Sequence, residues 1–127
     1  MQRLIALLAT SAALLATTAI SSNEAARAAQ ADSSPPSAER GKKLIAEIGC
    51  GLCHRIPGID QATGNVGPPL DGIGSRAFIA GVLNNTTDNM VHWLRFPQKV
   101  VPGNAMPDMA LDESQARDIA AYLETIK

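Results

Sequence analysis

Cysteine, histidine and large aromatic side chains are all scarce in this sequence. Its 127 residues include two cysteines, two histidines, two phenylalanines, one tryptophan and one tyrosine. A structural zinc site usually needs four Cys or His ligands. The chain offers only Cys50, Cys53, His54 and His92, and His54 directly follows Cys53, so a zinc site is not expected. A single small domain with so few large side chains would gain from a bulky apolar group in its core.

An excess of basic residues is also missing. The sequence has 11 Lys and Arg against 12 Asp and Glu, which gives a formal net charge of −1. Proteins that bind nucleic acids usually present a strongly basic face, so nucleic acid is not expected among the partners. Two small basic clusters, Lys42 with Lys43 and Arg95 with Lys99, are interpreted as solvated surface.

The most informative stretch is the run Cys50-Gly51-Leu52-Cys53-His54. Two thiols three positions apart, with an imidazole directly after the second, are typical of c-type haem attachment. Each thiol can add across one vinyl group of the same porphyrin edge, and the histidine can then offer a ring nitrogen to the iron. The run therefore predicts one haem c, bound covalently through Cys50 and Cys53, with His54 as an iron ligand. Such a haem would also supply the bulky core group.

Two other interpretations of the cysteine pair stay open at this point. A thioredoxin-like C-x-x-C motif would follow a strand in a βαβ unit, whereas a helical stretch precedes Cys50 and almost nothing downstream has a strand pattern. A disulfide between Cys50 and Cys53 would fit an oxidising compartment, but it would leave His54 unexplained. A thiol redox module without haem is therefore kept as a separate class of function.

The N-terminal segment, residues 1–28, has the features of a secretory signal peptide. Arg3 gives a positive start, residues 4–20 are apolar, and residues 26–28 (Ala-Arg-Ala) form a small-residue cleavage pattern, with an earlier cut near Ser21 as an alternative. We therefore expect an exported, periplasmic protein. An uncleaved membrane anchor is the other interpretation, although the apolar stretch is slightly short of the roughly 20 residues that span a bilayer. Contact with a membrane is expected only in that case.

Residues 29–37 are polar and rich in Pro and Ser, and a disordered leader or linker is expected there. The folded domain is predicted to cover residues 38–127. Its first helix has a suitable N-cap in Ser37 and a suitable end at Gly49. Gly41 has no side chain, so this helix can approach another closely.

The last helix has the clearest pattern in the chain. Asp112 and Gln115 form a capping box, and apolar residues follow at helical spacing, from Ala116 to Leu123. Its small alanines permit close contact, and the expected partner is the first helix at Gly41.

The middle of the domain contains one more helix between loops. Residues 55–74 are dense in Gly and Pro and are predicted to be a loop. The apolar stretch 76–83 is expected to pack near the haem. Thr87 is predicted to cap a helix over Asp88–Arg95, which ends before Pro97. Residues 100–107 are expected to form an extended loop.

Met106 is the candidate for a second iron ligand. A thioether is a soft ligand that suits haem iron, and a methionine between turn residues is a poor core-filler. Met109, three residues further on, is the nearer rival. Met90 has the helical spacing of a core residue. His92 could give a two-histidine haem, but a histidine on a helix beside Arg95 is more often solvated.

Pro68 and Trp93 are candidates for contacts around the haem. A metal-bound histidine usually donates its other N–H to an acceptor, and the Pro68 carbonyl could serve His54 in this way. Alternatively, Pro68 and Pro69 only stiffen a turn. The Trp93 indole N–H could reach a haem propionate, or the ring could simply pack in the core.

Together these motifs resemble the class I (monohaem) cytochrome c family. The resemblance covers residues 38–127 and rests on four segments: the Cys50–His54 run, Gly67-Pro68-Pro69-Leu70, Pro102-Gly103-Asn104-Ala105-Met106-Pro107 and Ala120-Ala121-Tyr122-Leu123. It implies an all-α, small cytochrome c fold in which the N- and C-terminal helices cross and loops wrap a covalent haem. It also implies thioethers at Cys50 and Cys53, iron ligands His54 and Met106, and a hydrogen bond from His54 to the Pro68 carbonyl.

Residues 76–106 are also similar to cytochrome c domains that are fused to haem–copper terminal oxidases or serve them. No copper-site cluster of Cys and His is present in the sequence. The resemblance implies a monomeric single-electron carrier, not an enzyme, that shuttles electrons between respiratory redox proteins, with a terminal oxidase or a dehydrogenase as candidate partners. The alternative function is a haem enzyme or gas sensor with an open or labile sixth iron position.

Overall fold

The computed structural model describes residues 34–127, so the predicted signal peptide and most of the predicted leader lie outside the described residues. Pro35–Lys127 form one compact unit. Its elements, in chain order, are α2 (Ala38–Ile48), η1 (Cys50–Leu52), η2 (Ile73–Ser75), β1 (Phe78–Ile79), β2 (Leu83–Asn84), α3 (Thr87–Arg95), α4 (Pro97–Val100) and α5 (Glu113–Leu123). The predicted all-α class is confirmed, with one short antiparallel hairpin of β1 and β2 added.

Helix α2 begins and ends where the sequence predicts. The Ser37 hydroxyl accepts a hydrogen bond from the Arg40 N–H at 3.3 Å and caps the first turn. Gly49 follows the last residue with φ 86°, a left-handed conformation that glycine adopts without steric cost. The turn at Gly49 leads the chain directly into η1.

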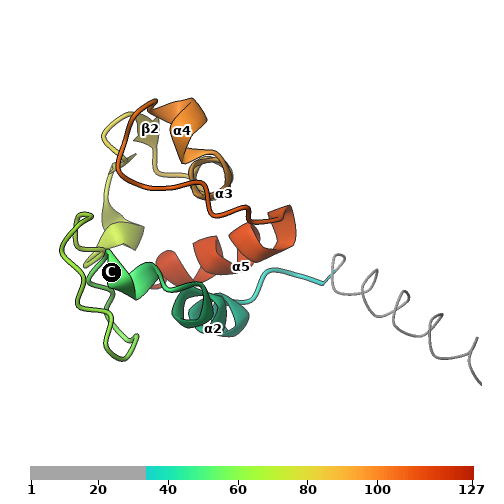
Figure 1. Cartoon of the computed structure of the whole chain (residues 1–127). Coiled ribbons are helices and arrows are strands. Elements are labelled where there is room, and N and C mark those ends of the chain that lie inside the picture. Colours follow the sequence, from blue (N-terminus) through green and yellow to red (C-terminus); the bar gives the residue numbers. More distant parts are fainter. Residues whose placement is uncertain (1–33) are drawn as a thin grey trace, which may run out of the picture. The chain divides into compact units, whose positions relative to one another are not determined.

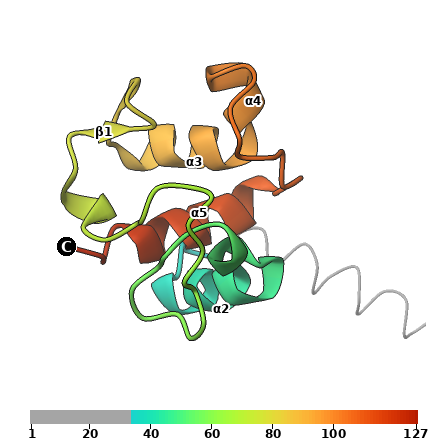
Figure 2. The same ribbon diagram turned by 60° about the vertical axis from the view of Figure 1, so that its left-hand side comes forward.

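Helix α5 has the predicted capping box. The Asp112 carboxylate accepts from the Gln115 N–H at 2.7 Å, and Gln115 Oε1 accepts from the Asp112 N–H at 3.1 Å. The helix packs against α2 on one side and α3 on the other, as Figures 1 and 2 show. It is therefore the central element of the domain.

The predicted close contact of the first and last helices is also confirmed. A Cβ atom placed on Gly41 would lie 1.9 Å from the Asp118 carbonyl oxygen on α5. In Figure 1, α2 is seen nearly end-on and α5 from the side, so the two helices cross. Only glycine permits this backbone-to-backbone approach.

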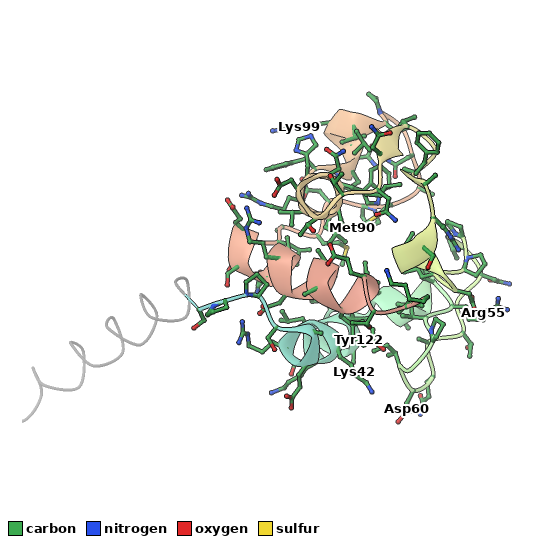
Figure 3. All side chains as sticks on the ribbon, turned by 180° about the vertical axis from the view of Figure 1, so that it is seen from behind. Lys42, Arg55, Asp60, Met90, Lys99 and Tyr122 are labelled. Atoms are coloured by element: carbon green, nitrogen blue, oxygen red, sulfur yellow. The ribbon has the colours of Figure 1, made fainter. Side chains whose placement is uncertain are left out.

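The core gathers around α5. Met90 is 3% exposed and lies between α3 and α5 (Figure 3), which confirms its predicted core position. The buried apolar residues are Ile45, Ile56, Ala62, Ile73, Ile79, Met90, Val91, Leu94, Ala116, Ile119, Ala120, Leu123 and Ile126. None of the helices within residues 34–127 has the length and apolarity needed to cross a bilayer.

Two local predictions need correction. The N-cap of α3 is Thr86, not Thr87, because the Thr86 hydroxyl accepts from the Asn89 N–H. A further helix, α4, begins at Pro97, whose fixed φ suits a first helical position, so the extended loop starts after Val100. The apolar stretch 76–83 holds β1 and the first residue of β2, with Ile79 buried and Phe78 55% exposed, and its contact with the haem stays a prediction.

An ion pair between the half-exposed Arg40 and the buried Asp118 links the start of α2 to α5. Arg40 Nε and Nη2 donate to the two oxygens of Asp118 at 2.7 and 2.8 Å, and the Ser37 N–H donates to the same carboxylate at 2.7 Å. Arg40 also donates to the Pro35 carbonyl at 2.6 Å. Burial alone would raise the pKa of Asp118, but the hydrogen bonds from Arg40 and Ser37 and the Arg40 charge outweigh it and lower that pKa.

The substitution Gly41→Ala tests the helix contact. The added methyl group meets the Asp118 carbonyl, so we expect a loss of about 3 kcal/mol in the free energy of unfolding. Alanine is a better helix former than glycine by about 1 kcal/mol, so the sign of the change is informative. Urea unfolding followed by circular dichroism measures it. The control Ala46→Gly, on the exposed side of α2, should cost only about 1 kcal/mol. A neutral or stabilising Gly41→Ala would contradict the close approach.

The substitution Asp118→Asn tests the ion pair through its dependence on pH. The folded pKa of Asp118 is lowered, so its stabilisation is present above the unfolded pKa of about 3.9 and is lost as the pH falls through the folded value. We expect the variant to melt about 5 °C below the unchanged protein at pH 7, with the gap closing towards pH 3. Glu47→Gln, in the exposed pair with Lys43 at 3.7 Å, should change little. A gap independent of pH would argue against the carboxylate's role.

Candidate functional site

The cysteine pair lies on a closed turn directly after α2. The Cys50 carbonyl accepts hydrogen bonds from the Cys53 N–H at 3.2 Å and from the His54 N–H at 3.0 Å. Both cysteines are free thiols and half-buried, while Leu52 between them is 82% exposed. Burial raises the pKa of the Cys50 thiol above its ordinary value, so that thiol stays protonated near neutral pH. The turn therefore carries two free, half-buried thiols beside an exposed leucine.

The loop that follows the turn folds back onto it through backbone hydrogen bonds. The Gly64 N–H donates to the Gly51 carbonyl at 3.0 Å, and the Gly67 N–H donates to the Cys53 carbonyl at 2.8 Å. In Figure 2 this loop passes across the front of α5. The predicted loop thus has a fixed path, and it brings Gly67 and Pro68 to the His54 side chain.

His54 and Pro68 are brought together as predicted from the sequence. His54 Nδ1 lies 2.7 Å from the Pro68 carbonyl oxygen, which can only accept, so Nδ1 carries the hydrogen. The ring also lies on Gly67, where an added Cβ would be 2.3 Å from His54 Cε1. Nε2 is therefore the ring nitrogen with a free lone pair, which is the state a metal-ligating histidine requires.

Three side chains that sequence reasoning did not assign hold the outer part of this loop. The Tyr122 hydroxyl on α5 donates to the Pro57 carbonyl at 2.9 Å, and burial raises the pKa of this phenol. Arg76 Nη2 donates to the carbonyls of Pro69 and Asp71, both at 2.7 Å. Arg55, labelled with Tyr122 in Figure 3, pairs with Asp71 at 2.9 Å. A tyrosine at the edge of a helix was a usable signal, since a packed Tyr usually finds a partner for its hydroxyl.

Met106 lies in the loop between α4 and α5, half-buried against the core. Its N–H donates to Asn104 Oδ1 at 2.7 Å, and its carbonyl accepts from Gln98 Nε2 at 2.8 Å. Met109 is also half-buried and remains a rival by position, whereas His92 is exposed. Asn104 was detectable, since an Asn beside Pro-Gly often bonds a nearby backbone group. Gln98 on α4 gave no local signal.

Trp93 packs against the same core cluster as Cys50 and Met106. Of the two interpretations of Trp93, packing in the core is therefore observed. Contact of its indole N–H with a haem propionate stays a prediction. Among residues 34–127, no hydrogen bond links Trp93 or Met106 to the pair of His54 and Pro68. The same residues hold no group of three or more His, Cys, Asp or Glu side chains that could bind a metal ion, so a zinc site gains no support there.

The residues of this site fit a covalently attached haem. The two thiols are free and placed on one turn. His54 points its donor nitrogen Nδ1 at the Pro68 carbonyl, so Nε2 is the ring nitrogen that could bind a metal. Partly buried apolar side chains, including Leu70, Leu83 and Trp93, pack against the same core cluster as Cys50. This arrangement defines the class: a helical domain that holds haem through a cysteine pair.

Comparison with known proteins identifies the family. The sequence model described as Cytochrome c matches residues 38–127, and the chain belongs to the cytochrome c family. Members of this family carry haem c bound covalently through cysteines, and Cys50 and Cys53 are the two cysteines of this chain. The predicted cofactor and fold are therefore confirmed, whereas the axial ligands stay a prediction.

Several known proteins share part of their sequence or their fold with this chain. Cytochrome c2 of Rhodopila globiformis is 37% identical over 101 residues, which cover 68% of this chain and 91% of that protein. Cytochrome c oxidase subunit 2 of Alkalihalophilus pseudofirmus is 36% identical over 93 residues, covering 71% of this chain but only 26% of the subunit. The chain thus spans about a quarter of the length of that relative. The crystal structure of SoxXA from P. pantotrophus shares the fold, with a TM-score of 0.59, 22% identity, and coverage of 75% of this chain and 85% of that one.

The substitution Gly67→Ala tests the seat of the His54 ring. The new methyl group would overlap the ring, so we expect it to move His54 away from Pro68 and to lower the yield of low-spin, haem-bearing protein about tenfold. Mass spectrometry measures the haem content, and absorption spectra report the spin state. Val66→Ala, at the neighbouring exposed position, is the matched control and should leave both unchanged. An unchanged spectrum for Gly67→Ala would mean that the ring is not held as described.

Proposed function

We propose that this domain is a single-electron carrier whose haem c has His54 and Met106 as axial ligands. The contact of His54 Nδ1 with the Pro68 carbonyl carries the proposal, because it orients the ring and increases the basicity of Nε2. When bound, haem c supplies one-electron exchange at iron, and methionine ligation raises its potential.

The chain's own residues support transfer without substrate chemistry. The turn with Cys50 and Cys53 lies at the surface, with Leu52 82% exposed between them, so a redox partner can come close to the attachment edge. The fixed loops around His54 and Met106 would keep both ligands in place in either oxidation state. No acid–base set is needed for this function, and we propose that the protein is not an enzyme.

A thiol redox module fits the cysteine pair less well. Thiol–disulfide oxidoreductases lower the pKa of their attacking cysteine, whereas burial raises the pKa of Cys50 here. Membership of the cytochrome c family points the same way.

For partners, we propose an electron donor and an electron acceptor of a respiratory chain, with a terminal oxidase as the acceptor. The similarity to subunit 2 of cytochrome c oxidases supports this choice. A dehydrogenase remains the other candidate partner. We further propose that the protein is a monomer exported to the periplasm, the usual place of such carriers. The segment that would direct export, residues 1–28, lies outside the described residues.

Absorption spectra of the purified ferric and ferrous protein, with carbon monoxide as a probe, test the ligand pair. We expect a low-spin haem c in both states that the gas does not alter, since both axial positions are filled. Met106→Ala should open one position, so that the ferrous form binds carbon monoxide. Met109→Ala is the matched control and should behave like the unchanged protein.

Three results would contradict the assignment. Gas binding by the unchanged protein would favour a haem enzyme or a gas sensor with an open or labile position. Opening of the iron by Met109→Ala, in place of Met106→Ala, would move the ligand to Met109. Cysteines without added haem mass in the exported protein would revive the thiol redox module.

A further inference from the structure

We propose that Gln98 and Asn104 are positioning residues that hold the Met106 loop closed, so that other ligands do not readily displace the Met106 sulfur. The inference rests on the proposed ligation by Met106. It concerns how firmly the sulfur is held, not whether it binds.

The backbone around Met106 has almost no support of its own. Among the described residues, no backbone–backbone hydrogen bond involves any residue from Ala105 to Leu111. The histidine side of the site differs, because Gly64, Gly67 and Leu70 all bond backbone to backbone there. Whatever fixes Met106 must therefore come from side chains.

Gln98 spans the loop with both ends of its amide. Its Nε2 donates to the carbonyls of Met106 at 2.8 Å and of Asn104 at 2.9 Å. Its Oε1 accepts from the Gly103 N–H at 3.1 Å. One side chain thus satisfies three backbone groups on the segment that leads up to and includes Met106.

Asn104 completes the network from inside the loop. Its Oδ1 accepts from the Met106 N–H at 2.7 Å, while its Nδ2 donates to the carbonyls of Pro97 and Val101 at 2.9 and 2.6 Å. Met106 is therefore held at its N–H by Asn104 and at its carbonyl by Gln98. Both amides connect the loop to the α4 turn, whose first residue, Pro97, is fully buried.

The energetic consequence concerns the open state of the loop. A competing ligand can bind only when the Met106 sulfur has left, so its apparent affinity scales with the open population. Removing the Gln98 amide deletes three hydrogen bonds that exist only in the closed loop. Their loss should raise the open population about tenfold.

Imidazole binding to the ferric, haem-bearing protein, followed by absorption titration, tests this inference. We expect Gln98→Ala to bind imidazole about tenfold more tightly than the unchanged protein. Gln98→Glu should do the same, because it keeps an acceptor for Gly103 but loses both donors. Asn104→Ala removes the other half of the network and should have a similar effect. Lys99→Ala is the matched control. Lys99 is on the same helix as Gln98, α4, but its side chain lies over the Phe96 ring and makes none of these contacts.

A double substitution separates positioning from a general structural role. In a Met106→Ala background, Gln98→Ala should change imidazole affinity no further, because no sulfur remains to be displaced. An equal effect in both backgrounds would overturn the inference. Gln98 variants with the imidazole affinity of the unchanged protein would also overturn it. If Met106→Ala still bound imidazole tightly in that case, the ligand assignment would stand. If Met106→Ala itself left the affinity unchanged, the assignment and the inference would both fall.

Discussion

The contact between α2 and α5 sets the position of the turn that carries both cysteines. Gly41 lets the backbones of α2 and α5 touch at Asp118. The side-chain carboxylate of Asp118 also pairs with Arg40 and accepts a hydrogen bond from the Ser37 N–H. Because α2 ends at Gly49 and runs directly into η1, the placement of α2 on α5 also places Cys50 and Cys53. A shift of one helix on the other would displace the turn that carries both thiols.

The two proposed iron ligands are held by different means. His54 lies in a segment tied by backbone hydrogen bonds, with its ring between Gly67 and the Pro68 carbonyl. Met106 lies in a segment that forms no backbone–backbone hydrogen bonds with any part of residues 34–127, and two amide side chains hold it instead. Backbone bonds tolerate most substitutions, whereas an amide clamp depends on two particular residues. The methionine side is therefore the part of the site that sequence variation can loosen or tighten most easily.

Much of this arrangement was readable from the sequence because the signals were local. The caps of α2 and α5, the C-x-x-C-H run and the Pro68 acceptor each depend on residues a few positions apart or on a motif with fixed spacing. Gly41 was readable too, because a glycine in a helix often marks a close contact. The error at Thr86 was a shift of one residue between two adjacent threonines, either of which can cap.

The missed features are all contacts between distant or unpatterned residues. Arg40 and Asp118 are 78 positions apart, so neither neighbourhood reveals the pair. Arg76 bonds to carbonyls, which every residue carries, so its partners have no sequence signature. The β1–β2 hairpin was missed because strands of two residues are too short to show alternation. Gln98 belongs to the same group, since its three partners are backbone atoms.

The pairing of the first helix with the last has a consequence for how the chain is assembled. A polypeptide is synthesised from its N-terminus, so Cys50, Cys53 and His54 are made well before the residues of α5, against which α2 packs. Until then the first helix lacks its main apolar partner, and a helix of 11 residues is marginal alone in water. During that interval both thiols are on a flexible chain and open to chemistry. The interval ends when α5 forms and packs against α2.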